Sequence, residues 1–424
     1  MTAAMANPAH SAPLPAASDS RLSAGLYWLH AIALFAFAVC VNCSIAGAHL
    51  TLGLLTLCVI AQSGKRGAKS VERKAWSEIF FLGIEWPLVA LVIVGIISTS
   101  LSEKPLDSFR NLRHLLTILG AYAVAHSLRW HPQWRRPLLW TFITSATAFS
   151  IFGLGEFALG SSSKVRSTQG TTMTWGALCV MFMAVTLQVA LSAPARRQRW
   201  LARAQIIPQL FAMLLSFVRG AYVGFTASVI YLLRPYWTNR RIFLQRILPV
   251  LLLFILVATF FSPASVRQRV EAIFNLNTGS TQVRLVQWKY ALQIIADHPL
   301  IGVGWRDLQP VLRQYATPDP NLPEHVKKDV FSIGHFHSTY LTILACLGVS
   351  GLAVFLWLMA AAWRKLGELM KLAGNEEQRL VIYASRAAMI GFLVAGIFDW
   401  TFGDAEVVTM FWFVIGMGLG QVRG

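Results

Sequence analysis

The sequence contains few charged residues, and acidic residues are the scarcer kind. Only 13% of its 424 residues are charged and 55% are hydrophobic, whereas soluble domains carry roughly 25% charged residues. This composition excludes a chain of ordinary soluble domains. The 37 basic residues outnumber the 19 acidic ones and give a formal net charge of +18. In a soluble protein such an excess suggests nucleic-acid binding, so the positions of the basic residues have to decide its meaning.

Cysteine is also scarce. The five cysteines are Cys40, Cys43, Cys58, Cys179 and Cys346. All lie in or at the edge of apolar segments, which argues against a disulfide framework. Cys40 and Cys43 form a CxxC pair, but no second pair of ligands follows nearby. Free thiols packed in helices are therefore favoured over a metal or redox site.

The first residues do not have the pattern expected of a cleaved signal peptide. Residues 1–20 are rich in Ala, Pro and Ser and contain no basic stretch before the first apolar segment. This pattern predicts a disordered cytoplasmic tail.

Long apolar segments dominate the rest of the chain. A helix needs ~20 predominantly apolar residues to cross a ~30 Å hydrocarbon layer. Candidate segments are 24–41, 44–62, 79–100, 113–128, 138–158, 172–193, 205–218, 220–235, 246–261, 338–362, 381–398 and 405–421. They predict an all-α, polytopic membrane protein with about twelve transmembrane helices, nine within 21–261 and three within 338–424.

The basic residues gather in every second connection between these segments. The intervening short connections hold only Lys104, Arg110, Arg113, Lys164, Arg166 and Arg219. Because cytoplasmic loops are enriched in Lys and Arg, this bias predicts that both termini lie in the cytoplasm. Most of the positive charge then reflects membrane topology, and we expect no nucleic-acid partner.

One connection on the opposite, non-cytoplasmic side is long, at residues 262–337. Within it, residues 282–297 place apolar side chains at helical spacing, and His298-Pro299 ends the pattern. Residues 306–315 predict a second, short helix after a glycine-containing turn. We expect this periplasmic loop to place amphipathic helices over a cavity between the spans.

Three arginines on the non-cytoplasmic side are candidate ligands of an anion. Arg166 follows a serine-rich loop, Arg219 occupies a very short connection next to Gly220, and Arg284 opens the amphipathic helix. A charge at a membrane edge is costly unless it is paired. Guanidinium groups match phosphate oxygens in a two-point contact, so a phosphate is a natural partner. The alternative is contact with lipid headgroups or a loop carboxylate.

A second cluster lies where the long loop meets the tenth span. It comprises His335, His337, Ser338 and Tyr340. The two histidines lack further ligands at a usable spacing, which disfavours a metal site. A histidine at a cavity mouth is suited to taking a proton from a hydroxyl group, because its ordinary pKa is near ~6.5. The alternative for His337 is a structural histidine at the membrane interface.

The carboxylates Asp399, Asp404 and Glu406 surround the last short connection. Such a group could hold a divalent cation, but carboxylates also cap helices and pair with Arg or His at membrane edges. Since arginines already offer positive charge to a phosphate, we expect neither a metal nor another cofactor.

Three motifs together resemble the O-antigen ligase and polymerase superfamily of bacterial membrane glycosyltransferases. They are SFVRG at 216–220, RLVQW at 284–288 followed by HPLIGVG at 298–304, and HSTYL at 337–341 followed by LGVSG at 347–351. Their order and spacing are more specific than any one of them, and the predicted spans extend the resemblance over nearly the whole chain.

The resemblance implies a GT-C-like fold in the bacterial inner membrane, with the active site facing the periplasm and membrane lipids around it. It implies transfer of a glycan, with inversion, from undecaprenyl pyrophosphate to an acceptor hydroxyl. In the ligase branch the acceptor is lipid A-core, in the polymerase branch another lipid-linked repeat, and in a third branch a protein serine.

In this family, His337 corresponds to the base that deprotonates the acceptor. Arg219 and Arg284, together with Arg166, correspond to ligands of the donor pyrophosphate. The supporting positions are Gly220, Trp288, His335, Ser338 and Tyr340.

Two interpretations outside this family remain. A twelve-span transporter of an anionic or lipid-linked substrate would explain a basic cavity, although it predicts related halves and interrupted helices. A structural membrane protein would explain neither the histidines nor the arginines.

Overall fold

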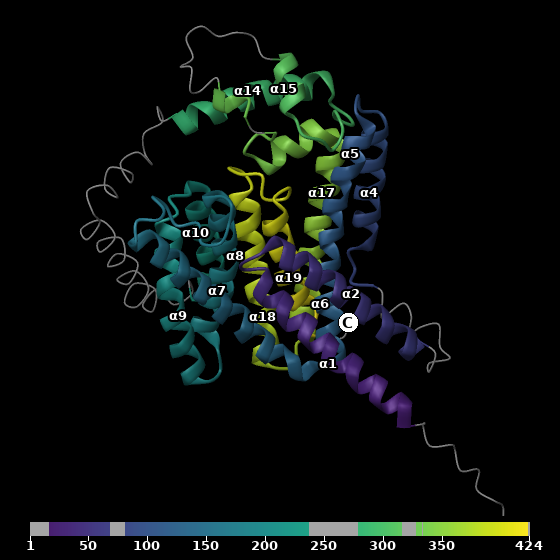
Figure 1. Ribbon diagram of the computed structural model, residues 1–424, viewed down its shortest axis with the longest axis vertical. Coiled ribbons are helices and arrows are strands. Elements are labelled where there is room, and N and C mark those ends of the chain that lie inside the picture. Colours follow the sequence, from purple (N-terminus) through teal and green to yellow (C-terminus); the bar gives the residue numbers. More distant parts are fainter. Residues whose placement is uncertain (1–16, 68–80, 237–278, 316–327, 333, 423–424) are drawn as a thin grey trace, which may run out of the picture.

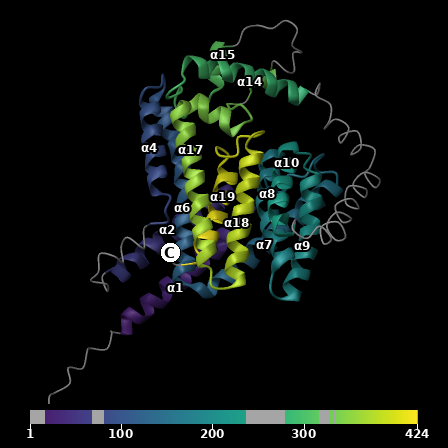
Figure 2. The same cartoon turned by 180° about the vertical axis from the view of Figure 1, so that it is seen from behind.

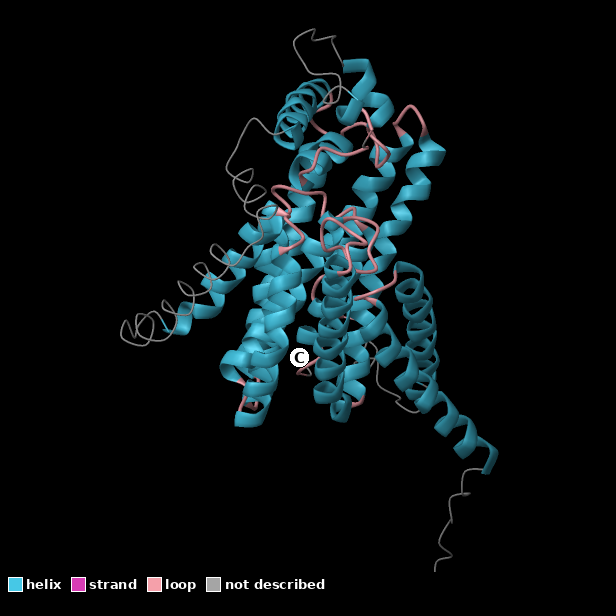
Figure 3. Cartoon of the chain, turned by 60° about the vertical axis from the view of Figure 1, so that its left-hand side comes forward, coloured by secondary structure: helices cyan, strands magenta, loops and turns pink. Residues whose placement is uncertain are grey.

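The computed structural model describes residues 17–67, 81–236, 279–315, 328–332 and 334–422. Over these residues the chain forms helices joined by loops and contains no strand (Figure 3). The helices are α1 (Ala17–Cys40), α2 (Ile45–Gly67), α4 (Glu85–Ser100), α5 (Pro105–Leu112), η1 (Arg113–Ile118), α6 (Leu119–Trp130), η2 (Pro132–Trp134), α7 (Arg135–Ala158), α8 (Thr172–Ser192), α9 (Arg196–Leu214), α10 (Arg219–Leu233), η3 (Arg234–Tyr236), α14 (Gly279–Asp297), α15 (Gln309–Tyr315), α17 (Thr339–Leu372), α18 (Glu376–Ala395) and α19 (Ala405–Leu419).

These helices account for eleven of the twelve apolar segments. The ninth segment, 246–261, lies outside the described residues. Five helical stretches are long and apolar enough to cross a membrane: Ile45–Ser63, Pro132–Ala158, Thr172–Ser192, Thr339–Leu372 and Glu376–Ala395. The described part of the chain therefore has the helical architecture of a polytopic membrane protein.

Several predicted boundaries were wrong. Helix α1 begins at Ala17, inside the predicted tail. Helix α9 begins at Arg196 rather than near residue 205, and α18 ends at Ala395 instead of continuing to residue 398. The short helix α15 begins at Gln309 rather than residue 306, because Oδ1 of Asp307 accepts a hydrogen bond from the Gln309 amide at 2.9 Å and thereby starts the helix there.

Helices α8 and α19 form the centre of the bundle. Helix α8 packs against α9, α10 and α18, and α19 packs against α6 and α18. Figures 1 and 2 show α8, α18 and α19 between the outer helices. The side chains of Trp175 and Phe182 on α8 and of Trp412 on α19 are fully buried. Such a helix is apolar on all sides because it contacts other helices rather than lipid or water.

Glycines allow α10 and α18 to approach each other closely. A Cβ atom added to Gly224 would lie 2.7 Å from the carbonyl oxygen of Gly391 and 2.9 Å from Cβ of Ala395. Ser228, one turn further along α10, donates a hydrogen bond from Oγ to the carbonyl of Ala387 at 2.9 Å. Small residues and hydroxyl groups commonly stabilise helix pairs in membranes in this way.

Helices α14 and α15 lie across one end of the bundle (Figure 1). We call this the α14 end. The segment that follows α14 reaches down to α17 and pairs with it through the backbone. The amides of Val303 and Gly304 donate to the carbonyls of Ala345 and Cys346, both at 2.9 Å, and the Val349 amide donates to the carbonyl of Pro299 at 2.8 Å.

This pairing is possible because α17 is interrupted at Gly348, which has φ 66° and ψ −167°. The interruption exposes backbone groups that an unbroken helix would use internally. At the crossing, Gly302 also has a positive φ of 65°. The first turns of α17 consequently lie at an angle to its longer part, beneath α14 (Figures 1 and 2).

We predict that Gly302→Ala and Gly348→Ala each lower the melting temperature of the purified protein by several degrees. An added Cβ at Gly302 would overlap backbone atoms of Cys346, and one at Gly348 would overlap those of Leu300. Overpacking typically costs about 1–3 kcal/mol, and a left-handed backbone adds to this cost. Gly155→Ala is the matched control, because no atom lies within 4 Å of that added Cβ. An unchanged melting temperature in both crossing variants would contradict the role assigned to the crossing.

Candidate active site

His337 lies at the α14 end, directly before α17. Its backbone has a positive φ of 47°, and its side chain is only 6% exposed. Two hydrogen bonds hold the preceding residue, Phe336: its carbonyl accepts from Nε1 of Trp288 on α14 at 2.9 Å, and its amide donates to Oγ1 of Thr342 on α17 at 3.2 Å. These hydrogen bonds connect the residue before His337 to α14 and α17, and they stabilise the positive φ at His337.

Asp399 faces His337 from the connection between α18 and α19. Oδ1 of Asp399 lies 3.6 Å from Nδ1 of His337, slightly longer than a hydrogen bond, and the Asp399 side chain is 17% exposed. The same Oδ1 accepts from the Trp400 amide at 2.9 Å. Burial raises the pKa of the Asp399 carboxyl, but His337, His335 and this amide together hold the pKa below its ordinary value. Asp399 is therefore an anion beside the imidazole at neutral pH.

Thr339 holds these two segments together. Its amide donates to the carbonyl of Gly396 at 2.7 Å, and its hydroxyl donates to the carbonyl of Asp399 at 3.0 Å. The hydroxyl also lies 3.1 Å from Oγ1 of Thr401. The sequence analysis did not single out Thr339, because a threonine at the start of a helix is common.

His335 supports His337 and remains uncharged. Nδ1 of His335 accepts a hydrogen bond from the His337 amide at 3.2 Å, and the two rings meet edge to face at 4.8 Å between centroids. Burial, and then the neighbouring His337 and Arg284, lower the pKa of His335 to about 4, despite the opposite effect of Asp399. A buried, neutral imidazole already engaged at Nδ1 is a weaker candidate for proton transfer than His337.

Arg219 and Arg284 approach the same region from two helices. Arg219 is the first residue of α10, and its Nη1 donates to Oγ1 of Thr281 on α14 at 3.1 Å. Arg284 lies one helical turn beyond Thr281. Burial lowers the pKa of Arg284, the Arg219 charge lowers it further, and Asp399 opposes both. The two guanidinium groups, Asp399 and the histidines thus share one electrostatic environment.

Gly220 explains how α10 reaches this region. A Cβ atom added to Gly220 would lie 3.2 Å from Cβ of Phe398, the residue before Asp399. The start of α10 therefore packs directly against the segment that carries the carboxylate. The absence of a side chain at Gly220 thus permits close approach of another part of the chain.

Arg166 lies in a loop near the start of α10, and the residue is exposed. The adjacent Val165 amide donates to the carbonyl of Leu215, four residues before Arg219, at 2.9 Å. The loop thus borders the arginine pair, but Arg166 is not enclosed with His337.

Ser338 and Tyr340 make structural contacts. Oγ of Ser338 caps α17 by accepting a hydrogen bond from the Leu341 amide at 3.5 Å. The Tyr340 hydroxyl donates to the carbonyl of Leu393 on α18 at 2.8 Å. These contacts fix the start of α17 rather than presenting groups to a ligand.

The carboxylates Asp404 and Glu406 occupy a different position from Asp399. Asp404 caps α19 by accepting hydrogen bonds from the amides of Glu406 and Val407, and its Oδ2 accepts from Thr174 at 2.5 Å. Burial and the neighbouring Glu406 raise the pKa of Asp404 to about 7. No group of three or more metal-binding side chains occurs among the residues that the structure describes.

One ion pair at the same end escaped the sequence analysis. Nη2 of Arg306 lies 3.1 Å from Oε2 of Glu103, and their side chains are 6% and 65% exposed. This pair ties the segment after α14 to the connection between α4 and α5. Sequence alone offers no reason to choose Glu103 as the partner, because the two residues lie far apart in the chain.

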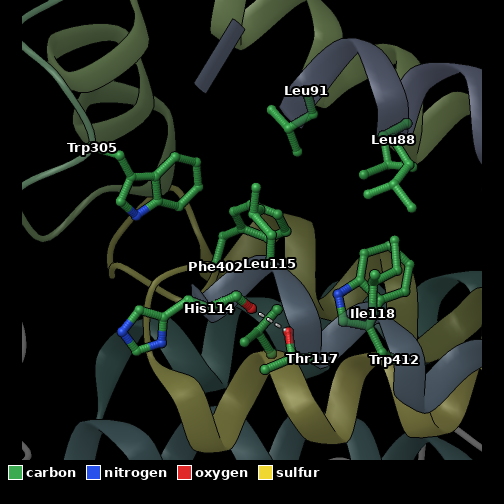
Figure 4. Close-up of a pocket in the computed structure, with 11 residues that line it drawn as sticks. Leu88, Leu91, His114, Leu115, Thr117, Ile118, Trp305, Phe402 and Trp412 are labelled. Atoms are coloured by element: carbon green, nitrogen blue, oxygen red, sulfur yellow. Dashed lines mark hydrogen bonds between the residues drawn. The ribbon is translucent and has the colours of Figure 1, made fainter. Parts of the chain in front are cut away.

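A small, mainly apolar pocket lies between α4, η1, α17 and α19 (Figure 4). Trp305 and Phe402 form its side nearest the loops, and Trp412 forms part of its base. The lining residues are Leu88, Leu91, His114, Leu115, Thr117, Ile118, Trp305, Leu358, Phe402, Val408 and Trp412. Because the lining contains no Arg or Lys, this pocket is not the place where the arginines would bind an anion.

Comparison with known protein families matches one part of the chain. Residues 204–356 match a family model described as O-antigen ligase. The matched stretch contains Arg219, Arg284 and His337 but neither Arg166 nor Asp399. No curated protein sequence matches the chain.

We predict that Trp288→Phe loosens the loop around His337 without unfolding the protein. The substitution keeps an aromatic ring but removes the N–H group that donates to the Phe336 carbonyl, and a typical hydrogen bond contributes about 0.5–1.5 kcal/mol. Hydrogen–deuterium exchange of residues 334–342 should accelerate roughly three- to tenfold. Trp400→Phe is a matched control at the same end. Unchanged exchange in Trp288→Phe would show that the hydrogen bond does not hold this loop.

Proposed function

We propose that the chain transfers an O-antigen glycan from undecaprenyl pyrophosphate to a sugar hydroxyl of lipid A-core, completing lipopolysaccharide; the match of residues 204–356 to the O-antigen ligase family supports this. One observation supports this most strongly: His337 lies beside Asp399, in the same electrostatic environment as Arg219 and Arg284. A base and two guanidinium groups are what an acceptor hydroxyl and a departing pyrophosphate require.

The arginines bind and neutralise the donor. Arg219 from α10 and Arg284 from α14 hold the pyrophosphate oxygens, while Arg166 extends the positive surface at the border of the site. The effect of the Arg219 charge on Arg284 supports this role, because two neighbouring cations are stabilised by an anion between them. Their interaction strengthens as negative charge develops on the leaving group. The reaction therefore needs no metal ion.

His337 activates the acceptor. The imidazole removes the proton from the acceptor hydroxyl as its oxygen forms a bond to the anomeric carbon of the glycan. The bond between that carbon and the phosphate oxygen breaks, and undecaprenyl pyrophosphate leaves with the bonding electrons. Asp399 stabilises the imidazolium that results, and the single displacement inverts the anomeric centre.

The membrane placement follows from the charge distribution. The loops rich in Arg and Lys lie in the cytoplasm together with both termini, so the α14 end faces the periplasm of the bacterial inner membrane. The lipid-linked donor and lipid A-core both reach the site from the surrounding membrane.

We expect His337→Ala to reduce transfer about 10²- to 10⁴-fold, the usual effect of losing a general base. The assay uses purified protein, undecaprenyl-pyrophosphate-linked glycan and lipid A-core, and the wild type should convert both into lipopolysaccharide. His335→Ala is the comparison variant and should act more mildly, since it removes a support for the His337 amide rather than the base.

Two results would overturn these assignments. Near-normal turnover by His337→Ala would remove His337 from the mechanism. Extension of the lipid-linked glycan by the wild type, without transfer to lipid A-core, would make the chain a polymerase with the same donor site.

Arg219→Lys and Arg284→Lys should each reduce transfer roughly ten- to hundredfold. Lysine keeps the charge but loses the planar two-point contact, and hydrogen bonds to charged groups contribute about 1.5–3 kcal/mol. Both turnover and donor affinity should fall. The control is Arg313→Lys, an exposed arginine of α15 at the same end of the bundle. Full activity of either site variant would assign that arginine to a structural contact.

A further inference from the structure

A second cavity lies at the end of the bundle opposite α14. It is formed where α7, α9 and α18 begin and where α8 and α19 end, and its volume is about 270 Å³. The lining residues are Pro132, Arg135, Arg136, Leu139, Trp140, Val189, Ala193, Pro194, Gln198, Asn375, Glu377, Gln378, Leu380, Val381 and Gln421. None of them belongs to the candidate active site.

One part of the lining is basic and polar. Arg135 and Arg136 are adjacent there, and Glu377 is the single acidic residue in the lining. The side-chain amide oxygen of Gln198 faces Arg136. This oxygen accepts hydrogen bonds from Nη2 of Arg136 at 2.6 Å and from Nε at 2.8 Å. This two-point contact orients the guanidinium plane at the cavity instead of leaving it to move in solvent.

Other arginines at this end have a different role. Arg129 donates from Nε and Nη2 to the carbonyl of Leu419, and Arg199 donates to the carbonyls of Ala193 and Pro194. These side chains cap carbonyl groups where helices end. Arg135 and Arg136 instead belong to helix α7 at its beginning, where the positive end of the helix dipole adds to their charge.

The rest of the lining is apolar. Leu139 and Trp140 come from α7, Val189 from α8, and Leu380 and Val381 from α18. A cavity lined both by guanidinium groups and by aliphatic and aromatic side chains fits an amphiphile with an anionic head. In a membrane protein, basic pockets between helices commonly bind phospholipid headgroups in this way.

We propose that this cavity binds the glycerophosphate group of an anionic phospholipid, with Arg135 and Arg136 on the phosphate and the apolar lining against the start of the acyl chains. The lipid joins the ends of five helices and stabilises the bundle from the side opposite the active site. The same phosphate chemistry would also accept a soluble glycerol phosphate, so the test has to separate the two sources.

The test uses the full-length protein in nanodiscs containing phosphatidylcholine, with phosphatidylglycerol added in steps. Phosphatidylglycerol should raise the melting temperature of the wild type, and native mass spectrometry should detect a retained phosphatidylglycerol molecule. Arg135→Gln combined with Arg136→Gln should weaken this binding at least tenfold, because each lost charged hydrogen bond has roughly that effect.

Arg364→Gln is the matched control. Arg364 lies on α17 and does not line the cavity, its side chain is 74% exposed, and its Nε is 3.9 Å from Oε1 of Glu368. The Arg364→Gln substitution removes one positive charge without changing the cavity. This variant should bind the lipid as the wild type does. If the double variant does not fold, Arg136→Lys provides a second test. This substitution keeps the charge, and we expect intermediate lipid binding.

The possible outcomes separate the alternatives. If millimolar sn-glycerol 3-phosphate displaces the bound phosphatidylglycerol, the ligand is a soluble phosphate ester. If it does not displace the lipid, the result supports the phospholipid. Equal retention of phosphatidylcholine and phosphatidylglycerol, or equal loss of binding in Arg364→Gln, would overturn the proposal, because the effect would then reflect surface charge alone.

Discussion

The candidate site depends on two hydrogen bonds of Thr339, one donated by its backbone amide and one by its side-chain hydroxyl. They join the start of α17 to the connection between α18 and α19, with distances of 2.7 Å to the Gly396 carbonyl and 3.0 Å to the Asp399 carbonyl. This junction helps to fix the position of Asp399 relative to His337. The junction is buried, so water does not compete for these bonds, and their geometry is well defined.

A second constraint acts on the same region through the backbone. The segment after α14 crosses α17 at Gly302 and Gly348, where neither residue can carry a Cβ. The crossing satisfies the backbone groups that the interruption of α17 sets free, and it determines the direction in which the first turns of α17 leave the bundle. The position of His337 thus depends on the interruption of α17, where the segment after α14 pairs with the backbone groups that the interruption exposes.

Electrostatics give this arrangement its chemical character. Charged groups at the edge of a membrane domain are costly unless they interact with one another or with a ligand. Here Asp399 interacts with the histidines and with Arg284, and Arg219 adds a second positive charge near Arg284. The proposed pyrophosphate would balance the excess positive charge at the α14 end. At the opposite end, the proposed phospholipid would do the same for Arg135 and Arg136, so that each end of the bundle has its own phosphate ligand.

The sequence by itself determined the helices and the candidate residues. Apolar periodicity depends on local spacing, and it correctly predicted helices in eleven segments and helix α14, although Leu285 and Leu292 of the predicted apolar face of α14 are exposed. The motifs around Arg219, Arg284 and His337 predicted a resemblance to the O-antigen ligase family, and residues 204–356 match the model of that family. The helix boundaries near residues 306 and 398 were wrong, because a side-chain cap from Asp307 and the turn toward Asp399 decide them.

Only the tertiary structure decided which groups meet. Asp399, Asp404 and Glu406 lie within eight residues of one another, and sequence gave no means to choose among them. The packing of Gly220 against Phe398 and the hydrogen bonds of Thr339 select Asp399 as the neighbour of His337, whereas Asp404 caps a helix. The Arg306–Glu103 pair and the cavity at Arg135 and Arg136 likewise join segments far apart in the chain. Such pairings depend on how helices pack, and no local pattern of residues encodes them.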